Sequence, residues 1–265
     1  MHWASSLAMF VAAGLAGGLL LGLIGVGMAL VAVPLLTLFL PEFGVPAESA
    51  PLTAIATSMG IVAIGSVSSA ISHHRLGNVD WRVVKLTVPF GLVGMAAGSL
   101  VAPHLPASAL QWIFAGFLVF VAIGMWRQAR AEHPSPLPSS PRYRVAGGTI
   151  GMAGSLIGAG GGIFMVPFLH RHGHDMASAV ATSTVIGLPV SILGTLVYAS
   201  QSNPGATPTT VGYIFLPALV GVSFGSILGA PLGARWASRV PAHALKRIFA
   251  VALLALAIKL VSEGA

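Results

Sequence analysis

The chain has 265 residues, of which 55% are hydrophobic and only 7% are charged, and its formal net charge is +7. Soluble domains carry about 25% charged residues, so this composition cannot cover a water-facing surface and excludes a soluble enzyme or a DNA-binding domain. The absence of cysteine excludes disulfides and thiolate metal sites. We therefore expect an all-α polytopic membrane protein with no nucleic-acid partner, whose excess of basic residues sets its orientation in the bilayer.

Eight apolar runs follow one another along the chain, and a helix needs roughly 20 apolar residues to cross the hydrocarbon. Six of the runs fit one crossing each. The first and the fifth are interrupted by glycines, at Gly25–Gly27 (GVG) and at Gly158–Gly162 (GAGGG). The eight apolar segments cover residues 7–40, 51–72, 83–104, 109–126, 145–169, 177–199, 211–234 and 245–261.

One linker divides the sequence. Segment 127–144 reads RQARAEHPSPLPSSPRYR, and its closely spaced prolines stop helices and favour an extended, solvated chain. We expect a cytoplasmic linker between a first membrane repeat, residues 1–126, and a second, residues 145–265.

The two halves repeat each other in four blocks that occur in the same order. LIGVGMALVAVPLL at 23–36 aligns without gaps with LIGAGGGIFMVPFL at 156–169, and Ala-Thr-Ser at 56–58 recurs at 181–183. One accidental match would carry little weight, but four in order indicate a duplication. The remaining two blocks pair Gly94, Gly98 and Ser99 with Gly221, Gly225 and Ser226, and Ala109, Leu110, Ile113 and Phe114 with Ala244, Leu245, Ile248 and Phe249.

The basic residues cluster in loops 73–85, 127–144 and 235–247, which the positive-inside rule places in the cytoplasm. The fifth run starts at the cytoplasmic linker 127–144. If the sixth run crosses the membrane once, the end of the fifth run, at 170–176, is also cytoplasmic. The fifth run is then a re-entrant hairpin with its glycines near mid-membrane. The repeat predicts that the first run also forms a re-entrant hairpin, which enters the membrane from the outside. A hairpin plus three crossings in each half gives inverted repeats, a plan of many secondary transporters. Eight plain crossings with parallel repeats are the alternative.

The glycines of both breaks are candidate substrate-binding residues, because a helix broken inside the bilayer frees N–H and C=O groups that lipid cannot satisfy. The half-helix after each break presents an N-terminus with free N–H groups, which suits an anion. Alternatively, the glycines only allow close helix packing, although three in a row exceed that need. The candidates are Gly25, Gly27, Gly158, Gly160, Gly161 and Gly162.

Repeated hydroxyls form a second candidate group, with Thr57 and Ser58 in the first half and Thr182 and Ser183 in the second. A hydroxyl can donate to an anion without adding charge, or it can bond back to its own helix. No Asp or Glu lies in the middle of any run, whereas a cation carrier would be expected to keep one buried. The substrate is therefore expected to be anionic or neutral.

Histidines at the membrane edges supply an alternative function. His73, His74, His170, His172 and His174 could bind metal, which would make the chain a membrane-embedded metal-dependent protein or a metal-ion transporter. A solvated, partly cationic loop explains them equally simply, so we expect no metal and no cofactor.

The two glycine-broken segments resemble the hallmark of the sulfite exporter TauE/SafE family, as do the Ala-Thr-Ser blocks and the loop Gly77–Trp81 (GNVDW). The first half departs from the pattern, with Met28 and Ala29 where the second half has Gly161 and Gly162. The resemblance implies a bacterial inner-membrane permease for sulfite, sulfoacetate or related organosulfonates, and not an enzyme.

Residues and resemblance together predict a multi-pass secondary transporter in the cell inner membrane that works by alternating access. Its expected partners are a small anionic substrate and the lipid bilayer, and a homodimer is compatible with this plan. The direction of transport and coupling to protons stay open.

Overall fold

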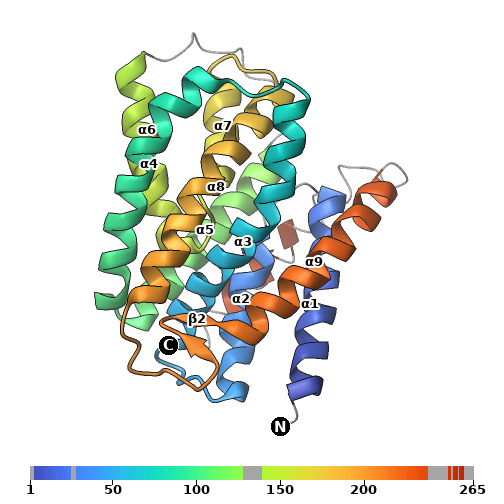
Figure 1. The fold of residues 1–265 in the computed structure, drawn as a ribbon, viewed down its shortest axis with the longest axis vertical. Helices are drawn as coiled ribbons and strands as arrows, with labels where there is room; N and C mark the ends of the chain where they lie inside the picture. The colour runs from blue at the N-terminus through green and yellow to red at the C-terminus, as the bar shows by residue number, and fades with distance from the viewer. Residues whose placement is uncertain are drawn as a thin grey trace.

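The computed structural model describes residues 3–24, 28–127 and 139–237, and residues 250–259 apart from 252 and 256. Most of them are helical, as predicted (Figure 1). The elements are α1 (Trp3–Ile24), α2 (Ala29–Phe39), η1 (Leu40–Phe43), α3 (Ala50–Arg75), α4 (Trp81–Val101), η2 (Ala102–His104), α5 (Ala107–Arg127), α6 (Ser140–Ile157), α7 (Gly162–Arg171), α8 (Met176–Ser200), β1 (Thr210–Val211), β2 (Ile214–Phe215) and α9 (Leu216–Ala237).

Three helices in the described part of the chain are long and apolar enough to cross a membrane, at Ala50–Arg75, Trp81–His104 and Met176–Ser200. Shorter apolar helical stretches occur elsewhere, at Leu7–Leu19, Ala29–Phe43, Ala107–Ile123 and Leu216–Leu232. These helices confirm the prediction of a helical membrane protein.

The described part of segment 127–144 includes the start of a helix. Helix α6 starts at Ser140, so Arg142 and Arg144 belong to its first turns. The guanidinium of Arg144 lies 5.8 Å from the centre of the Phe90 ring on α4. The basic residues at this end of α6 therefore border the helix bundle directly.

Each glycine-interrupted run forms two helices, and the second helix runs back to the end of the molecule where the first began. The ring of Phe10 in α1 lies 5.0 Å from that of Phe43, just beyond α2. At the opposite end, the ring of Tyr143 in α6 lies 6.1 Å from that of Phe168 in α7. We call these the Phe43 end, at the bottom of Figure 1, and the Phe168 end, at its top.

The helices of the two halves pack on one another reciprocally. Helix α1 lies along α9, and α4 lies along α6. The long helices α3 and α8 meet at the centre, with α2 against α3 and α7 against α8. The first helix of each half is therefore held by a helix of the other half, and the two halves interleave.

The repeated glycines explain why these helix pairs come so close. A Cβ at Gly94 would fall on the main chain of Gly148 in α6, and a Cβ at Gly225 would fall on that of Val11 in α1. Glycine has no Cβ, so the backbones can approach closely, as small residues allow in membrane helices. Gly94 and Gly98 of the first half thus face α6, and their counterparts Gly221 and Gly225 in the second half face α1.

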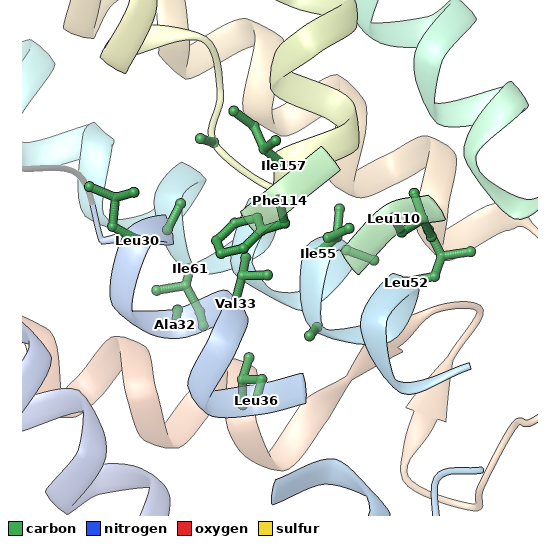
Figure 2. Close-up of a cluster of buried hydrophobic side chains, with 14 of the residues drawn as sticks. Leu30, Ala32, Val33, Leu36, Leu52, Ile55, Ile61, Leu110, Phe114 and Ile157 are labelled. Atoms are coloured by element: carbon green, nitrogen blue, oxygen red, sulfur yellow. The ribbon is translucent and has the colours of Figure 1, made fainter. Parts of the chain in front are cut away.

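A buried apolar cluster fixes the end of α6 against the first half. Val33 of α2, Ile55 of α3, Phe114 of α5 and Ile157 of α6 are each at most 2% exposed. Figure 2 shows these side chains converging from four different helices. Ile157 is the last residue of α6, so the cluster holds the point where the helix breaks.

The close approach of α4 and α6 predicts opposite effects for two glycine substitutions. Gly94→Ala places a methyl group on the Gly148 carbonyl, and such overpacking costs about 1–3 kcal/mol. Gly65→Ala has open space around its Cβ and gains helix propensity of up to about 1 kcal/mol. Thermal unfolding in detergent should show a lower midpoint for Gly94→Ala only. Equal midpoints for both variants would contradict the close packing of these helices.

Candidate functional site at the α6–α7 break

Two glycines with left-handed backbones make the break between α6 and α7. Gly158 (φ +70°) ends α6 and donates its N–H to the carbonyl of Gly154. Gly161 (φ +81°) precedes the first residue of α7. Residues with a Cβ rarely adopt these angles, and a left-handed glycine is a common way for a helix to end. The sequence therefore needs glycine at both positions for conformational reasons.

The break lies halfway along the two central helices. A Cβ at Gly160 would lie 3.1 Å from the Gly187 oxygen and from Ser191 Cβ, and 3.4 Å from Val62 Cγ1. Val62 is in the middle of α3, and Gly187 and Ser191 are near the middle of α8. Since α3 and α8 are long enough to cross a membrane, the break is far from both ends of the bundle.

The break leaves main-chain donors free. Within the described residues, the N–H groups of Gly160, Gly162 and Ile163 have no hydrogen-bond partner. Gly160 is buried, and an unpaired buried donor is unfavourable. Helices α6 and α7 contain no Asp or Glu that could accept these bonds. These N–H groups therefore meet no acceptor in the part of the chain that the structure describes.

Ser58 is the predicted hydroxyl that the structure brings to the break. Its side chain is fully buried, and Oγ donates to the carbonyl oxygen of Gly158 at 3.1 Å. The hydrogen bond connects the middle of α3 to the end of α6. Ser58 thus satisfies the Gly158 carbonyl at the break.

The other three predicted hydroxyls have main-chain partners away from the break. Thr57 Oγ1 accepts from the Phe215 N–H at 2.9 Å, and Thr182 Oγ1 accepts from the Asp80 N–H at 2.9 Å. Ser183 Oγ donates back to Ala179 of its own helix. The Ser183 carbonyl nevertheless lies close to the break, 3.9 Å from where a Cβ of Gly162 would be.

The corresponding break in the first half falls outside the described residues. Gly25 and Gly27 lie there, so the structure gives no account of these two candidates. Helix α2 follows directly, and the Met28 carbonyl accepts from the Ala32 N–H at 2.9 Å. Of the six candidate glycines, the structure therefore places Gly158, Gly160, Gly161 and Gly162.

The histidines of the second half lie at the Phe168 end, away from the break. His172 Nδ1 is 2.7 Å from the Phe168 carbonyl, His170 Nδ1 is 3.1 Å from the His174 carbonyl, and His174 Nε2 is 3.2 Å from Asp80 Oδ2. Among the described residues, no group of three His, Cys, Asp or Glu side chains could hold a metal ion. His174 instead connects the segment after α7 to Asp80 before α4, whereas His170 and His172 bond within the end of α7 and its turn.

Two residues that were not among the predicted site residues make buried or capping hydrogen bonds, Tyr198 next to the break and Asp80 at the Phe168 end. Tyr198 is fully buried on α8, and its hydroxyl donates to the Ser155 carbonyl in the last turn of α6 at 3.0 Å. Asp80 caps α4 by accepting from the N–H groups of Arg82 and Val83. An Asp directly before an apolar run is an N-cap signal, so Asp80 could have been found; Tyr198 carries no comparable local signal.

The sequence matches the family described as "Sulfite exporter TauE/SafE" over residues 10–260. A "Probable membrane transporter protein" of Haemophilus influenzae is 34% identical over 250 residues, which cover 93% of this chain and 95% of that protein. Similar proteins of Methanocaldococcus jannaschii and Bacillus subtilis, also named probable membrane transporter proteins, are each 26% identical, and the alignments cover 89% and 86% of this chain and 89% of each relative. No solved structure gives a significant match.

The contact between Ser58 and the break predicts a stability difference between two buried serines. Ser58→Ala leaves the Gly158 carbonyl without its donor, which costs about 1–3 kcal/mol. Ser191→Ala removes a hydroxyl that bonds within its own helix, to the Leu188 carbonyl, and should cost less. The measurement is the thermal unfolding of each purified variant. A Ser58→Ala protein as stable as the Ser191→Ala protein would refute the role given to Ser58.

Proposed function

Because the chain belongs to the sulfite exporter TauE/SafE family, we propose that it is a secondary transporter that moves a small sulfur-containing anion across the inner membrane by alternating access. Sulfite, sulfoacetate and related organosulfonates are the substrates we propose. The family and the apolar helices make the chain a multi-pass membrane protein of a transporter family rather than an enzyme.

The observation that carries this proposal is the set of N–H groups at the α6–α7 break that have no acceptor among the described residues. Gly160, Gly162 and Ile163 present these donors halfway along α3 and α8. A helix N-terminus carries about half a positive charge, and such an end binds anions through its N–H groups. Low dielectric strengthens the attraction. Sulfite and sulfonate oxygens are acceptors of the required kind.

We place the anion of this proposal beside Gly162 rather than beside Gly160. A Cβ at Gly162 would have a single neighbour within 4 Å, the Ser183 oxygen at 3.9 Å, whereas Gly160 is enclosed by α3 and α8. Gly158 and Gly161 shape the break through their backbone angles. We assign Gly25 and Gly27 the corresponding role in the first half, on the strength of the repeat.

Alternating access requires two arrangements of the same site, and inverted repeats provide them. Two observations support such a relation between the halves. Helix α2 returns to the Phe43 end and α7 returns to the Phe168 end. Helix α1 of the first half packs on α9 of the second, and the equivalent helix α6 of the second half packs on α4 of the first. In this proposal the halves tilt against each other about the contact between α3 and α8.

Inverted repeats can be tested with single cysteines, because the chain has none of its own. Glu48→Cys and Ala206→Cys lie in loops that adjoin at the Phe43 end, where Gly205 approaches Ser49. Leu76→Cys and Ala177→Cys lie at the Phe168 end. An impermeant thiol reagent should label the first two from one face of the membrane and the last two from the other. Labelling of positions 48 and 206 from opposite faces would mean eight plain crossings.

The anion site can be tested by three substitutions at Gly162, where a side chain fits. Gly162→Asp puts a carboxylate on the free N–H groups, so it competes with the substrate and repels it. At an effective dielectric constant of 20, two charges about 4 Å apart repel by about 4 kcal/mol, so sulfite flux into proteoliposomes should fall at least about tenfold. Gly162→Asn is the control that matches Asp in size but has no charge. Gly162→Ala should retain most of the sulfite flux.

The fold should survive these changes. An acidic residue in the first turn of a helix stabilises it by about 0.3–1 kcal/mol, so Gly162→Asp should unfold no earlier than Gly162→Asn. Undiminished sulfite flux through a well-folded Gly162→Asp protein would refute the site.

A further inference from the structure

Two threonines fasten the starts of two helices. Thr182 Oγ1 accepts the N–H of Asp80, the residue directly before α4, at 2.9 Å. Thr57 Oγ1 accepts the N–H of Phe215, the residue directly before α9, also at 2.9 Å. Both threonines are fully buried. We call these hydrogen bonds the Thr182 clasp and the Thr57 clasp.

The two clasps are equivalent positions of the duplicated sequence. Thr57 and Thr182 are the middle residues of the repeated Ala-Thr-Ser blocks, and α4 and α9 carry the repeated glycines. Each clasp joins one half of the chain to the other, across 158 residues for Thr57 and 102 for Thr182. The repeat has therefore kept a tertiary contact as well as a local motif.

The clasps lie at opposite ends of the molecule. Phe215 contacts Phe43, with ring centres 6.1 Å apart, so the Thr57 clasp is at the Phe43 end. Asp80 contacts His174 beyond the end of α7, with Oδ2 and Nε2 3.2 Å apart, so the Thr182 clasp is at the Phe168 end. The surroundings differ, with aromatic rings at one end and a contact between His174 and Asp80 at the other. The threonine hydrogen bond is what the two ends have in common.

We propose that the Thr57 and Thr182 clasps are the two gates of the transporter, one for each side of the membrane. The proposal rests on the transport function proposed above. A clasp holds its end closed by keeping the start of α4 or α9 on the central helices α8 and α3. Opening of one end breaks its clasp while the other stays formed. Thr57 and Thr182 are then positioning residues rather than ligands of the anion.

The chemistry of the clasp couples it to water. A main-chain N–H inside a protein needs an acceptor, and the Asp80 and Phe215 N–H groups have a threonine oxygen. If the buried Thr57 clasp opens without water, a donor and an acceptor are left unpaired, which is costly. The Thr182 clasp is part-buried, with its threonine fully buried and Asp80 nearer the surface. If the end is hydrated, water replaces both partners. Each clasp is therefore stable while its end is dry and can open when water enters.

The test uses two reporters placed alike, Val83→Cys and Ala218→Cys. Each lies three residues after the clasped N–H, and the native side chains are 2% and 0% exposed. In the full-length protein, Thr182→Val should raise the rate of thiol labelling at position 83 by about tenfold, the effect of losing a hydrogen bond of ordinary strength. It should leave position 218 unchanged. Thr57→Val should raise the labelling rate at position 218 and leave position 83 unchanged.

Two kinds of control separate a gate from a general loss of structure. Thr182→Ser and Thr57→Ser keep the acceptor oxygen and should restore the labelling of the parent protein. Thr184→Val removes a hydroxyl that bonds to Val180 of its own helix, at 2.8 Å, and should change neither reporter. Should a valine variant fail to fold, Thr182→Ala and Thr57→Ala remove the acceptor with less bulk and should give the same one-sided pattern.

A rise at both reporters in one variant, or at neither in folded protein, would overturn the proposal. Labelling requires no substrate, so its outcome is independent of the sulfite flux that tests the anion site. If the flux measurements contradict the anion site but labelling is one-sided, the proposed substrate is refuted and the proposal of the two gates is supported.

Discussion

The rest of this structure depends on one constraint, which is that polar main-chain groups inside a bilayer must find partners within the protein. At the break between α6 and α7, only some of the main-chain groups have a partner among the described residues. The Gly158 carbonyl receives the Ser58 hydroxyl, and the Gly154 carbonyl accepts the N–H groups of Gly158 and Ala159. On the other side, no described residue accepts from the N–H groups at the start of α7. N–H groups of this kind can bind an anion.

Glycine has two separate functions in this fold. At Gly158 and Gly161 it allows left-handed backbone angles, which break the helix. At Gly94 and Gly225 it only removes a side chain, so that α4 reaches α6 and α9 reaches α1. The second function interleaves the halves, because each of these helix pairs combines one helix from each half. The two sequence repeats are therefore parts of a single packed bundle.

Buried hydroxyls in this chain mainly serve the backbone. Ser58, Thr57 and Thr182 each bond to a main-chain group of the opposite half. A hydroxyl can satisfy such a group without bringing a charge into the bilayer, where charge is costly. These contacts position the break and the starts of α4 and α9. The specific geometry of the bundle thus comes from a few polar contacts within a largely apolar interior.

The sequence by itself determined the membrane class, the glycine break between α6 and α7, the repeat blocks and the family resemblance, because composition, periodicity and motif are properties of neighbouring residues. It also identified Ser58, Thr57 and Thr182, although as ligands of a substrate. Only the tertiary structure decided their partners, since Thr57 meets a residue 158 positions away and Thr182 one 102 positions away. The same holds for Tyr198 and Ser155, which are joined across two helices. Which helices lie side by side depends on packing between distant segments, and no local pattern records it.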